Sequence, residues 1–262
     1  MSDVTKLRAA KQGLGVRLDR EVVGVSVKTS GAFSRAHLLI DKKTSREYVG
    51  KIYALEDPMT RVLGAREFEC LNRLHHNNVV EMVDAVVSDD HLVLVTERLS
   101  GNHLLEEVLL GHTWTEAAAT MLIKEILEAV AHVHDEGIVH LDIQPDNIIF
   151  PRGTSSRSAG LEGLMKALSS LSVDTAGAGG RSDLGVVSCF VKLTGFSMAQ
   201  PVGQRQGLHM ASIMPPALWC PDFAAPELLR VTNAIDTNED NSEINITFAA
   251  DVWSIGVIAY LL

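Results

Sequence analysis

The apolar residues of this chain change their spacing near residue 98, and this change limits the folds that the chain can adopt. Before it, short apolar runs alternate with turn residues in the segments VVGVSV, AHLLI, EYVGKIYAL, NNVVEMVDAVV and HLVLVTE. Runs of this kind predict antiparallel strands. Residues 61–74 instead carry apolar side chains near helical spacing, at Val62, Ala65, Phe68, Leu71 and Leu74. The first part therefore predicts a small sheet with one helix.

The second part of the chain has mainly helical spacing. Residues 115–136 predict a long amphipathic helix, which Thr113 or Thr115 can cap and which Gly137 ends. Its apolar face is formed by Leu122, Ile126, Val130 and Val133. The segments NIIF and CFVKL predict short strands, and residues 251–262 predict a buried helix. A sheet-rich part followed by a helical part predicts an α+β fold with two lobes.

Two polar segments interrupt the second part. Residues 151–188 are rich in Gly and Ser and contain one short amphipathic stretch, LEGLMKALSSL. They predict a surface insertion, which is either a tolerated loop, an unspliced segment or a helix that docks a partner. Residues 231–247 predict a second exposed loop. We expect a lead segment at 1–21, a first lobe at 22–97 and a second lobe at 98–262.

Charge and cysteine content limit the partners and the compartment. The 262 residues carry a formal net charge of −10, which argues against nucleic acid or an anionic membrane as the main partner. Three widely spaced cysteines form no disulfide or zinc pattern and favour a reducing interior. The start lacks the apolar core of a signal peptide. The final run, IGVIAYLL, is too short to span a bilayer, and we expect it to be covered by further chain or by a partner.

The segment GIVHLDIQPDNIIF, residues 137–150, is the main candidate for a site with chemistry. It places Asp142 and Asn147 five positions apart, with Pro145 between them and apolar residues on both sides. Both types are common in turns and caps, so a purely structural role is the alternative. An acid and an amide are nevertheless costly to hold beside a core, and this favours a functional role.

Four motifs carry a resemblance to protein kinases. HLDIQPDN resembles the catalytic loop, and YVGK resembles the strand with the phosphate-binding lysine. AAPE and DVWSIGVIAYLL resemble the end of the activation segment and the helix beneath it. The order His140-Leu141-Asp142 resembles the same motif in the giant cytoskeletal muscle kinases titin, twitchin and obscurin. The segment GAFSRAHLLIDKKTSREYVGK favours the obscurin branch of that family. The resemblance covers residues 22–262 apart from the two insertions, and it implies the two-lobed protein-kinase fold.

The resemblance also implies roles for individual residues. Lys51 would hold the phosphates of ATP and Glu67 would pair with it. Asp142 would accept the proton of the incoming hydroxyl, and Asn147 would coordinate a metal. The remaining expected positions are the phosphate-loop residues Thr29, Gly31 and Ser34, the purine-contacting Ala36, Val49 and Ile149, and the hinge residues Thr96 and Glu97. An apolar column of Leu71, Met82, His140 and Phe196 would stand on Asp251.

The sequence departs from the kinase pattern where catalysis depends on charge. Gly195 stands where the metal-binding Asp is expected, and Asp183 in SDLG is a poor substitute because no strand precedes it. Mg²⁺ requires oxygen ligands, which glycine does not provide. Gln144 replaces the lysine that would neutralise the γ-phosphate, and the phosphate loop retains only Gly31 of three glycines. Leu141 replaces the arginine that reads a phosphorylated activation loop.

These departures favour one function over two alternatives. The first is a pseudokinase scaffold in a cytoplasmic, sarcomeric or cytoskeletal muscle protein, with weak ATP binding and uncertain Mg²⁺. Protein partners and flanking immunoglobulin- or fibronectin-like domains are expected, with no nucleic acid and no membrane. The second is an active serine/threonine kinase with an atypical metal site. The third is a non-functional fragment of a longer chain.

Overall fold

The computed structural model describes residues 20–27, 34–110, 114–151, 191–202, 220–230 and 246–262. The chain forms two compact units. The small unit comprises Met1–Leu74 and Val80–Arg98, and the large unit comprises His75–Val79 and Leu99–Leu262.

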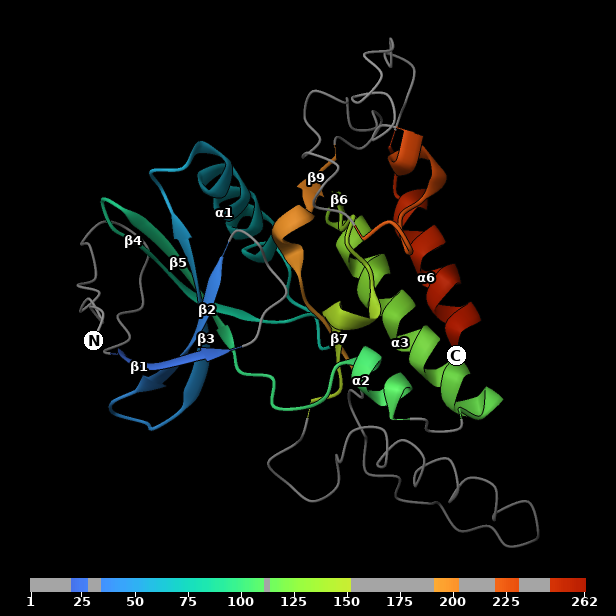
Figure 1. Ribbon diagram of the computed structural model, residues 1–262, viewed down its shortest axis with the longest axis horizontal. Helices are drawn as coiled ribbons and strands as arrows, with labels where there is room; N and C mark the ends of the chain where they lie inside the picture. Colours follow the sequence, from blue (N-terminus) through green and yellow to red (C-terminus); the bar gives the residue numbers. More distant parts are fainter. Residues whose placement is uncertain (1–19, 28–33, 111–113, 152–190, 203–219, 231–245) are drawn as a thin grey trace, which may run out of the picture. The chain divides into compact units, whose positions relative to one another are not determined.

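The small unit is built on a five-stranded antiparallel sheet with the strand order β1-β2-β3-β5-β4 (Figure 1). The strands are β1 (Arg20–Val27), β2 (Arg35–Asp41), β3 (Glu47–Ala54), β4 (Met82–Val87) and β5 (His91–Glu97). Leu39, Val93 and Val95 form an apolar cluster on the sheet. The short apolar runs of the sequence thus form the predicted antiparallel sheet, and in β5 four consecutive residues are buried.

Helix α1 (Pro58–Leu71) contacts β3 and β5 of the sheet. Asp57 caps its start, and its side chain accepts a hydrogen bond from the Thr60 amide at 2.8 Å. A helix forms where we predicted one, but its buried face is only partly the predicted one: Leu71 and Leu74 are buried, whereas Val62 is 41% exposed and Ala65 is exposed. The buried positions are Thr60, Leu63, Gly64, Glu67, Cys70 and Leu71. The spacing of apolar residues misplaced part of the buried face of α1, because Gly64 and Glu67 also lie on that face.

The large unit is mainly helical. Among its described residues, the helices are α2 (Leu104–Leu109), α3 (Glu116–Asp135) and α6 (Ala249–Leu261), with short 3₁₀ turns η1 (Pro145–Asn147) and η2 (Phe196–Met198). Residues 226–230 are helical as well. Two small antiparallel pairs join β6 (Ile138–Val139) to β9 (Gln200–Pro201) and β7 (Ile148–Ile149) to β8 (Lys192–Leu193). Helices α3 and α6 lie side by side (Figure 1). The α+β fold class is therefore as predicted.

Helix α3 confirms the sequence prediction closely. The Thr115 side chain accepts from the Ala118 amide at 3.2 Å, so Thr115 is the cap. The predicted stripe of Leu122, Ile126, Val130 and Val133 is buried. Gly137 follows the helix with φ of +67°, a backbone conformation that glycine adopts without strain.

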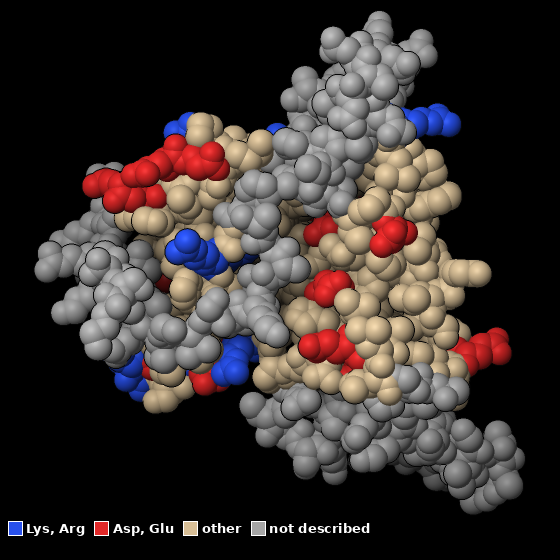
Figure 2. Space-filling model, viewed as in Figure 1, with Lys and Arg blue, Asp and Glu red and all other residues tan. Residues whose placement is uncertain are grey.

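Several sequence predictions fall on residues outside the described ranges. These include the cap candidate Thr113, nearly all of the insertion at 151–188 and most of the loop at 231–247. Among the described residues, no helix is long and apolar enough to cross a bilayer. The described Lys and Arg side chains form separate groups on the face drawn in Figure 2.

Candidate active site

One group of candidate site residues is an ion pair inside the small unit. Lys51 lies on β3, and its Nζ is 3.0 Å from Oε1 and 2.8 Å from Oε2 of Glu67 on α1. The Lys51 side chain is 18% exposed and that of Glu67 is 6% exposed. The Tyr53 hydroxyl also donates to Oε2 of Glu67. The sheet and its single helix thus bring a cation and its counter-charge together.

The other expected nucleotide positions of the small unit lie on its central strands. Ala36 of β2 is buried and stands opposite Lys51 of β3. Val49 of β3 stands opposite Thr96 of β5, and both are half-buried. Glu97 ends β5, and its Oε1 accepts from the Glu81 amide at 2.9 Å. Ser34 directly precedes β2, whereas Thr29 and Gly31 lie outside the described residues.

Another group of candidate site residues, in the large unit, rests on a buried aspartate of α6. Asp251 is 1% exposed, and its carboxylate accepts the backbone N–H groups of His140 and Leu141, both at 2.8 Å. His134 of α3 donates to the same carboxylate at 2.8 Å. Leu141 has φ of +63°, a strained conformation for a branched side chain. Asp251 therefore holds the loop in a conformation that it would otherwise leave.

His140 connects this loop to the segment that carries Gly195. Its Nε2 donates to the Thr194 carbonyl at 2.9 Å, so its Nδ1 accepts the Asp142 N–H at 3.2 Å. Burial lowers the pKa of His140 below its ordinary value of 6.5, against the opposing charge of Asp251. Its ring packs edge-on against Phe196, with centroids 4.5 Å apart. His140 is therefore the neutral Nε2–H tautomer.

Amide groups surround the carboxylate of Asp142. Gln144 Nε2 donates to Oδ1 at 2.7 Å, and Asn147 Nδ2 donates to Oδ2 at 2.7 Å. Asn147 Nδ2 also lies 2.7 Å from the Asp142 carbonyl oxygen. Pro145 starts the 3₁₀ turn that brings Asn147 back over Asp142. Both carboxylate oxygens thus accept from neutral donors.

Gly195 lies against the Asn147 side chain. Its φ is +81°, and a Cβ added there would lie 2.5 Å from Asn147 Nδ2 and closer still to Cγ and Oδ1. Thr194 fixes this approach, because its N–H and hydroxyl donate to the Asn147 carbonyl at 2.8 and 3.2 Å. The space that a side chain at 195 would need is therefore filled by the carboxamide of Asn147.

The donors present do not fit Mg²⁺. Gly195 supplies no side-chain oxygen, and the side-chain amide nitrogen of Asn147 faces the Asp142 carboxylate. Among the described residues, no group of three or more His, Cys, Asp or Glu side chains is arranged to hold a metal ion. Asp183 lies outside the described ranges. Lys51 does fit a phosphate, because it is a partly exposed ammonium held in one place by its carboxylate partner.

Ile149 and three of the four residues of the expected apolar column are buried. Ile149 of β7 is 9% exposed and pairs with Lys192 of β8. In the large unit, His140 and Phe196 are fully buried and touch each other. In the small unit, Leu71 is buried and Met82 is half-buried.

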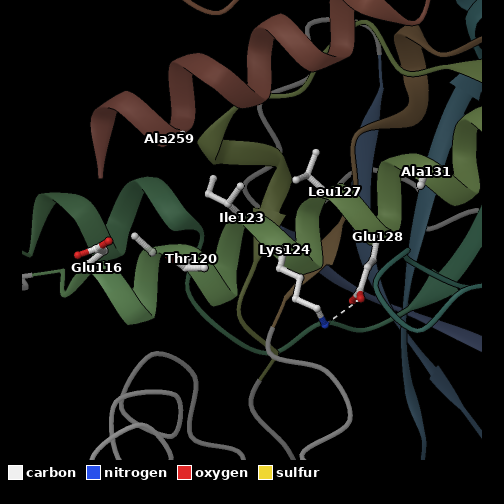
Figure 3. Close-up of a pocket in the computed structure, with 9 residues that line it drawn as sticks. Glu116, Thr120, Ile123, Lys124, Leu127, Glu128, Ala131 and Ala259 are labelled. Carbon is white, nitrogen blue, oxygen red and sulfur yellow. Dashed lines mark ion pairs between the residues drawn. The ribbon is translucent and has the colours of Figure 1, made fainter.

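A separate groove of about 610 Å³ lies along α3 and reaches Ala259 of α6 (Figure 3). Its lining is mostly apolar, and Lys124 and Glu128 form an ion pair of 2.9 Å beside Leu127. None of its lining residues belongs to the Asp142 loop or to the Gly195 segment. The groove is therefore not part of the candidate active site.

Comparison with known proteins shows the family to which the chain belongs. The protein kinase domain family matches residues 29–262, so the chain belongs to the protein kinase family. Smooth-muscle myosin light chain kinase of Gallus gallus is 27% identical over 234 residues, 89% of this chain and 10% of that protein. Calcium/calmodulin-dependent protein kinase type 1 of Caenorhabditis elegans is 27% identical over 249 residues, 93% of this chain and 54% of that protein.

A third relative is the probable serine/threonine-protein kinase fhkD of Dictyostelium discoideum, which is 26% identical over 243 residues. The match covers 88% of this chain and 27% of that protein. The chain thus spans between about a tenth and about half of the length of these three relatives. The fold is the α+β protein-kinase fold, with a sheet-rich small unit and a mainly helical large unit.

Sequence reasoning missed two residues of the site. Tyr53, which donates to Glu67, was read only as part of an apolar strand, although its position two residues after Lys51 places both on one face of β3. His134, which donates to Asp251, lies in the predicted helix at 115–136, and sequence reasoning assigned it no role of its own. Its distance of 117 residues from Asp251 left no local signal.

Proposed function

We propose that this kinase domain acts mainly as a pseudokinase, a protein-binding scaffold that retains weak nucleotide binding. The observation that carries the proposal is Gly195, which offers no metal ligand and whose side-chain space is filled by Asn147. Gln144 adds a second loss, since a neutral amide stands where a cation would neutralise the γ-phosphate.

The size of these losses supports the proposal. Removal of one charged or hydrogen-bonding group that stabilises a transition state costs about 10²–10³ in rate. Loss of both the metal ligand at 195 and the cation at 144 therefore lowers turnover by about 10⁴ or more if the effects are roughly additive. Such a rate is too slow for signalling.

Weak ATP binding is proposed for the Lys51 group. Protein kinase domains bind ATP with Mg²⁺, and Lys51 with its partner Glu67 retains the charge that contacts phosphates. Binding would then rest on this cation, on Ala36 and Val49, and on the hinge residues Thr96 and Glu97. Thr29, Gly31, Ser34 and Ile149 complete the proposed set. Metal would contribute little, since Asn147 alone makes an incomplete site.

The cellular setting is proposed from the resemblance to giant muscle kinases. The match to a smooth-muscle myosin light chain kinase supports a cytoskeletal setting. We infer an obscurin-like, cytoplasmic protein of the sarcomere or cytoskeleton. Its kinase lobes would span residues 22–97 and 98–262, with immunoglobulin- or fibronectin-like domains beside them. Its partners would be proteins.

An active serine/threonine kinase is the second candidate. The observation that favours it is the ordered loop: Asp251 and His140 hold Asp142, the proposed proton acceptor, in one position. In this candidate, ATP phosphorylates a protein hydroxyl through an atypical metal site. The relatives named above are kinases by name.

A phosphate-transfer assay separates the two candidates. The 262-residue chain is incubated with [γ-³²P]ATP, a general protein substrate and either Mg²⁺, Mn²⁺ or EDTA. The pseudokinase proposal expects the same background incorporation in the wild type and in Asp142→Asn. Metal-dependent incorporation that Asp142→Asn abolishes would overturn it and establish the second candidate.

A further inference from the structure

The Lys51–Glu67 pair has a third member that no kinase role accounts for. Tyr53 is fully buried on β3, and its hydroxyl donates to Oε2 of Glu67, which also accepts from Lys51. Because Lys51 and Tyr53 are two residues apart on a strand, they project from the same face toward α1. The Lys51 Nζ lies 5.4 Å from the centroid of the Tyr53 ring.

Helix α1 is shaped to accept the Tyr53 ring. A Cβ at Gly64 would lie 2.8 Å from Cγ and 3.1 Å from Cβ of Tyr53, and 3.0 Å from Cδ2 of Leu92. A glycine inside a helix costs stability relative to alanine, so its presence requires a compensating contact. Here the missing side chain lets α1 approach β3 closely enough for the phenol to reach Glu67, one helical turn further along.

The hydroxyl limits the movement of Glu67. A buried tyrosine hydroxyl needs a hydrogen-bond partner, and a carboxylate acceptor gives one of the stronger bonds. If Glu67 turned away from Lys51, the Tyr53 hydroxyl would be left buried without this acceptor. Tyr53 therefore opposes movements of α1 that carry the Glu67 carboxylate away from β3.

We propose that Tyr53 is a positioning residue that keeps Glu67 paired with Lys51, so that the phosphate-binding lysine is held in place before any nucleotide or metal binds. Gly64 is the second part of this device, because it makes room for the ring. The state of the ion pair would then be fixed by the core of the small unit rather than by an activating event.

The first test measures how exposed the Lys51 amine is. The full chain is acylated with a limiting amine-reactive ester, and labelling of Lys51 is measured by peptide mass spectrometry. We expect Glu67→Gln to raise the Lys51 labelling rate about tenfold and Tyr53→Phe to raise it about threefold. In the double variant, Tyr53→Phe should add nothing, because it acts through Glu67. Tyr260→Phe, at an exposed tyrosine, should match the wild type.

Two results of this test would overturn the proposal. One is a wild-type labelling rate in Tyr53→Phe. The other is a double variant that exceeds Glu67→Gln by the full Tyr53→Phe factor, which would make Tyr53 independent of Glu67. If Glu67→Gln fails to fold, Tyr53→Phe against Tyr260→Phe decides alone. This readout needs no nucleotide, so it stands even if the proposed nucleotide binding fails.

A second variant pair tests the space at Gly64. Gly64→Ala should displace the Tyr53 ring and raise Lys51 labelling about as much as Tyr53→Phe. Gly256→Ala is the matched control, because Gly256 lies in helix α6 with nothing within 4 Å of an added Cβ. Equal labelling of Lys51 in both alanine variants would contradict the role given to Gly64.

The nucleotide readout rests on the proposed function. ATP affinity in EDTA should fall about threefold in Tyr53→Phe and about tenfold in Glu67→Gln, with no further loss in the double variant. Raised Lys51 labelling with no ATP binding in any variant would retain the positioning role and remove the nucleotide-binding part of the proposed function. A threefold loss in Tyr53→Phe that persists in full on the Glu67→Gln background would contradict positioning through Glu67.

Discussion

The Lys51 group of the small unit and the Asp142 group of the large unit are built from different kinds of side chain. In the first, a cation meets a carboxylate, and a buried tyrosine donates to that carboxylate. In the second, the carboxylate of Asp142 meets two neutral amides, from Gln144 and Asn147. The contacts described for the Lys51 group thus include a full positive charge, and the two donors described for Asp142 are neutral amides.

The difference separates two tasks that an active kinase performs together. Holding a phosphate needs a fixed cation, which Lys51 supplies. Transferring it needs charge neutralisation at the reacting oxygens, which a metal and further cations supply. The amides of Gln144 and Asn147 each donate to one oxygen of the Asp142 carboxylate. Neutral amides do not supply the charge that phosphate transfer needs, and Gly195 adds no side-chain ligand.

The largest effect is expected at the base of the Asp142 loop. Asp251→Ala leaves two backbone N–H groups and His134 without their buried acceptor, and it releases the strained backbone of Leu141. We expect a loss of about 3–5 kcal/mol in the free energy of unfolding, as for other buried charged partners. Urea denaturation measures it. A loss below about 1 kcal/mol would show that Asp251 does not hold the loop.

An intermediate effect is expected at Gly195. Gly195→Ala adds a Cβ that overlaps the Asn147 carboxamide, in a backbone conformation that costs an L-residue roughly 1–2 kcal/mol. On an Asn147→Ala background the overlap disappears, and only the backbone cost should remain. Urea denaturation of the four proteins gives the coupling. Equal losses on both backgrounds would mean that Asn147 does not fill this space.

The smallest effect is a dependence of stability on pH through His140. Since burial lowers the pKa of His140 below 6.5 in the folded protein, the unfolded chain binds a proton there first as the pH falls. The contribution of His140 to the free energy of unfolding is therefore complete above pH 6.5. It is lost on acidification, by at most about 1.4 kcal/mol per pH unit. Melting temperatures between pH 7.5 and 5.5 measure it.

His140→Asn is the control for this pH dependence. It keeps a donor and an acceptor but does not titrate, so its melting temperature should fall less steeply with acid than that of the wild type. His76 is a further histidine whose pKa burial lowers, and it provides part of the slope in both proteins. The same slope in wild type and His140→Asn would assign the whole effect to other groups.

Much of the fold could be predicted because it depends on local periodicity. The strand HLVLVTE matches β5 (His91–Glu97) residue for residue, and the cap and stripe of α3 follow from Thr115 and its apolar spacing. The buried face of α1 was predicted only in part, because Gly64 and Glu67 are buried there through contacts with the sheet. Helix α2 (Leu104–Leu109) was missed because its six residues are too few for a clear period.

The candidate site could be predicted as a set of positions but not as a set of contacts. The motif resemblance indicated Lys51, Glu67, Asp142 and Asn147 by their order along the chain. It did not indicate that Gln144 donates to Asp142, nor that Asn147 lies over Gly195, because side-chain direction depends on the fold. Tyr53 carries no motif and becomes visible only when β3 and α1 are packed together.

Calorimetric titration of the 262-residue chain with ATP, in EDTA and in excess Mg²⁺, tests most directly whether the chain binds ATP without the help of a metal. We predict weak binding with dissociation constants that agree within about twofold in the two buffers, and loss of binding in Lys51→Met. Binding that Mg²⁺ tightens tenfold or more would contradict the account, as would the absence of any binding to the wild-type chain.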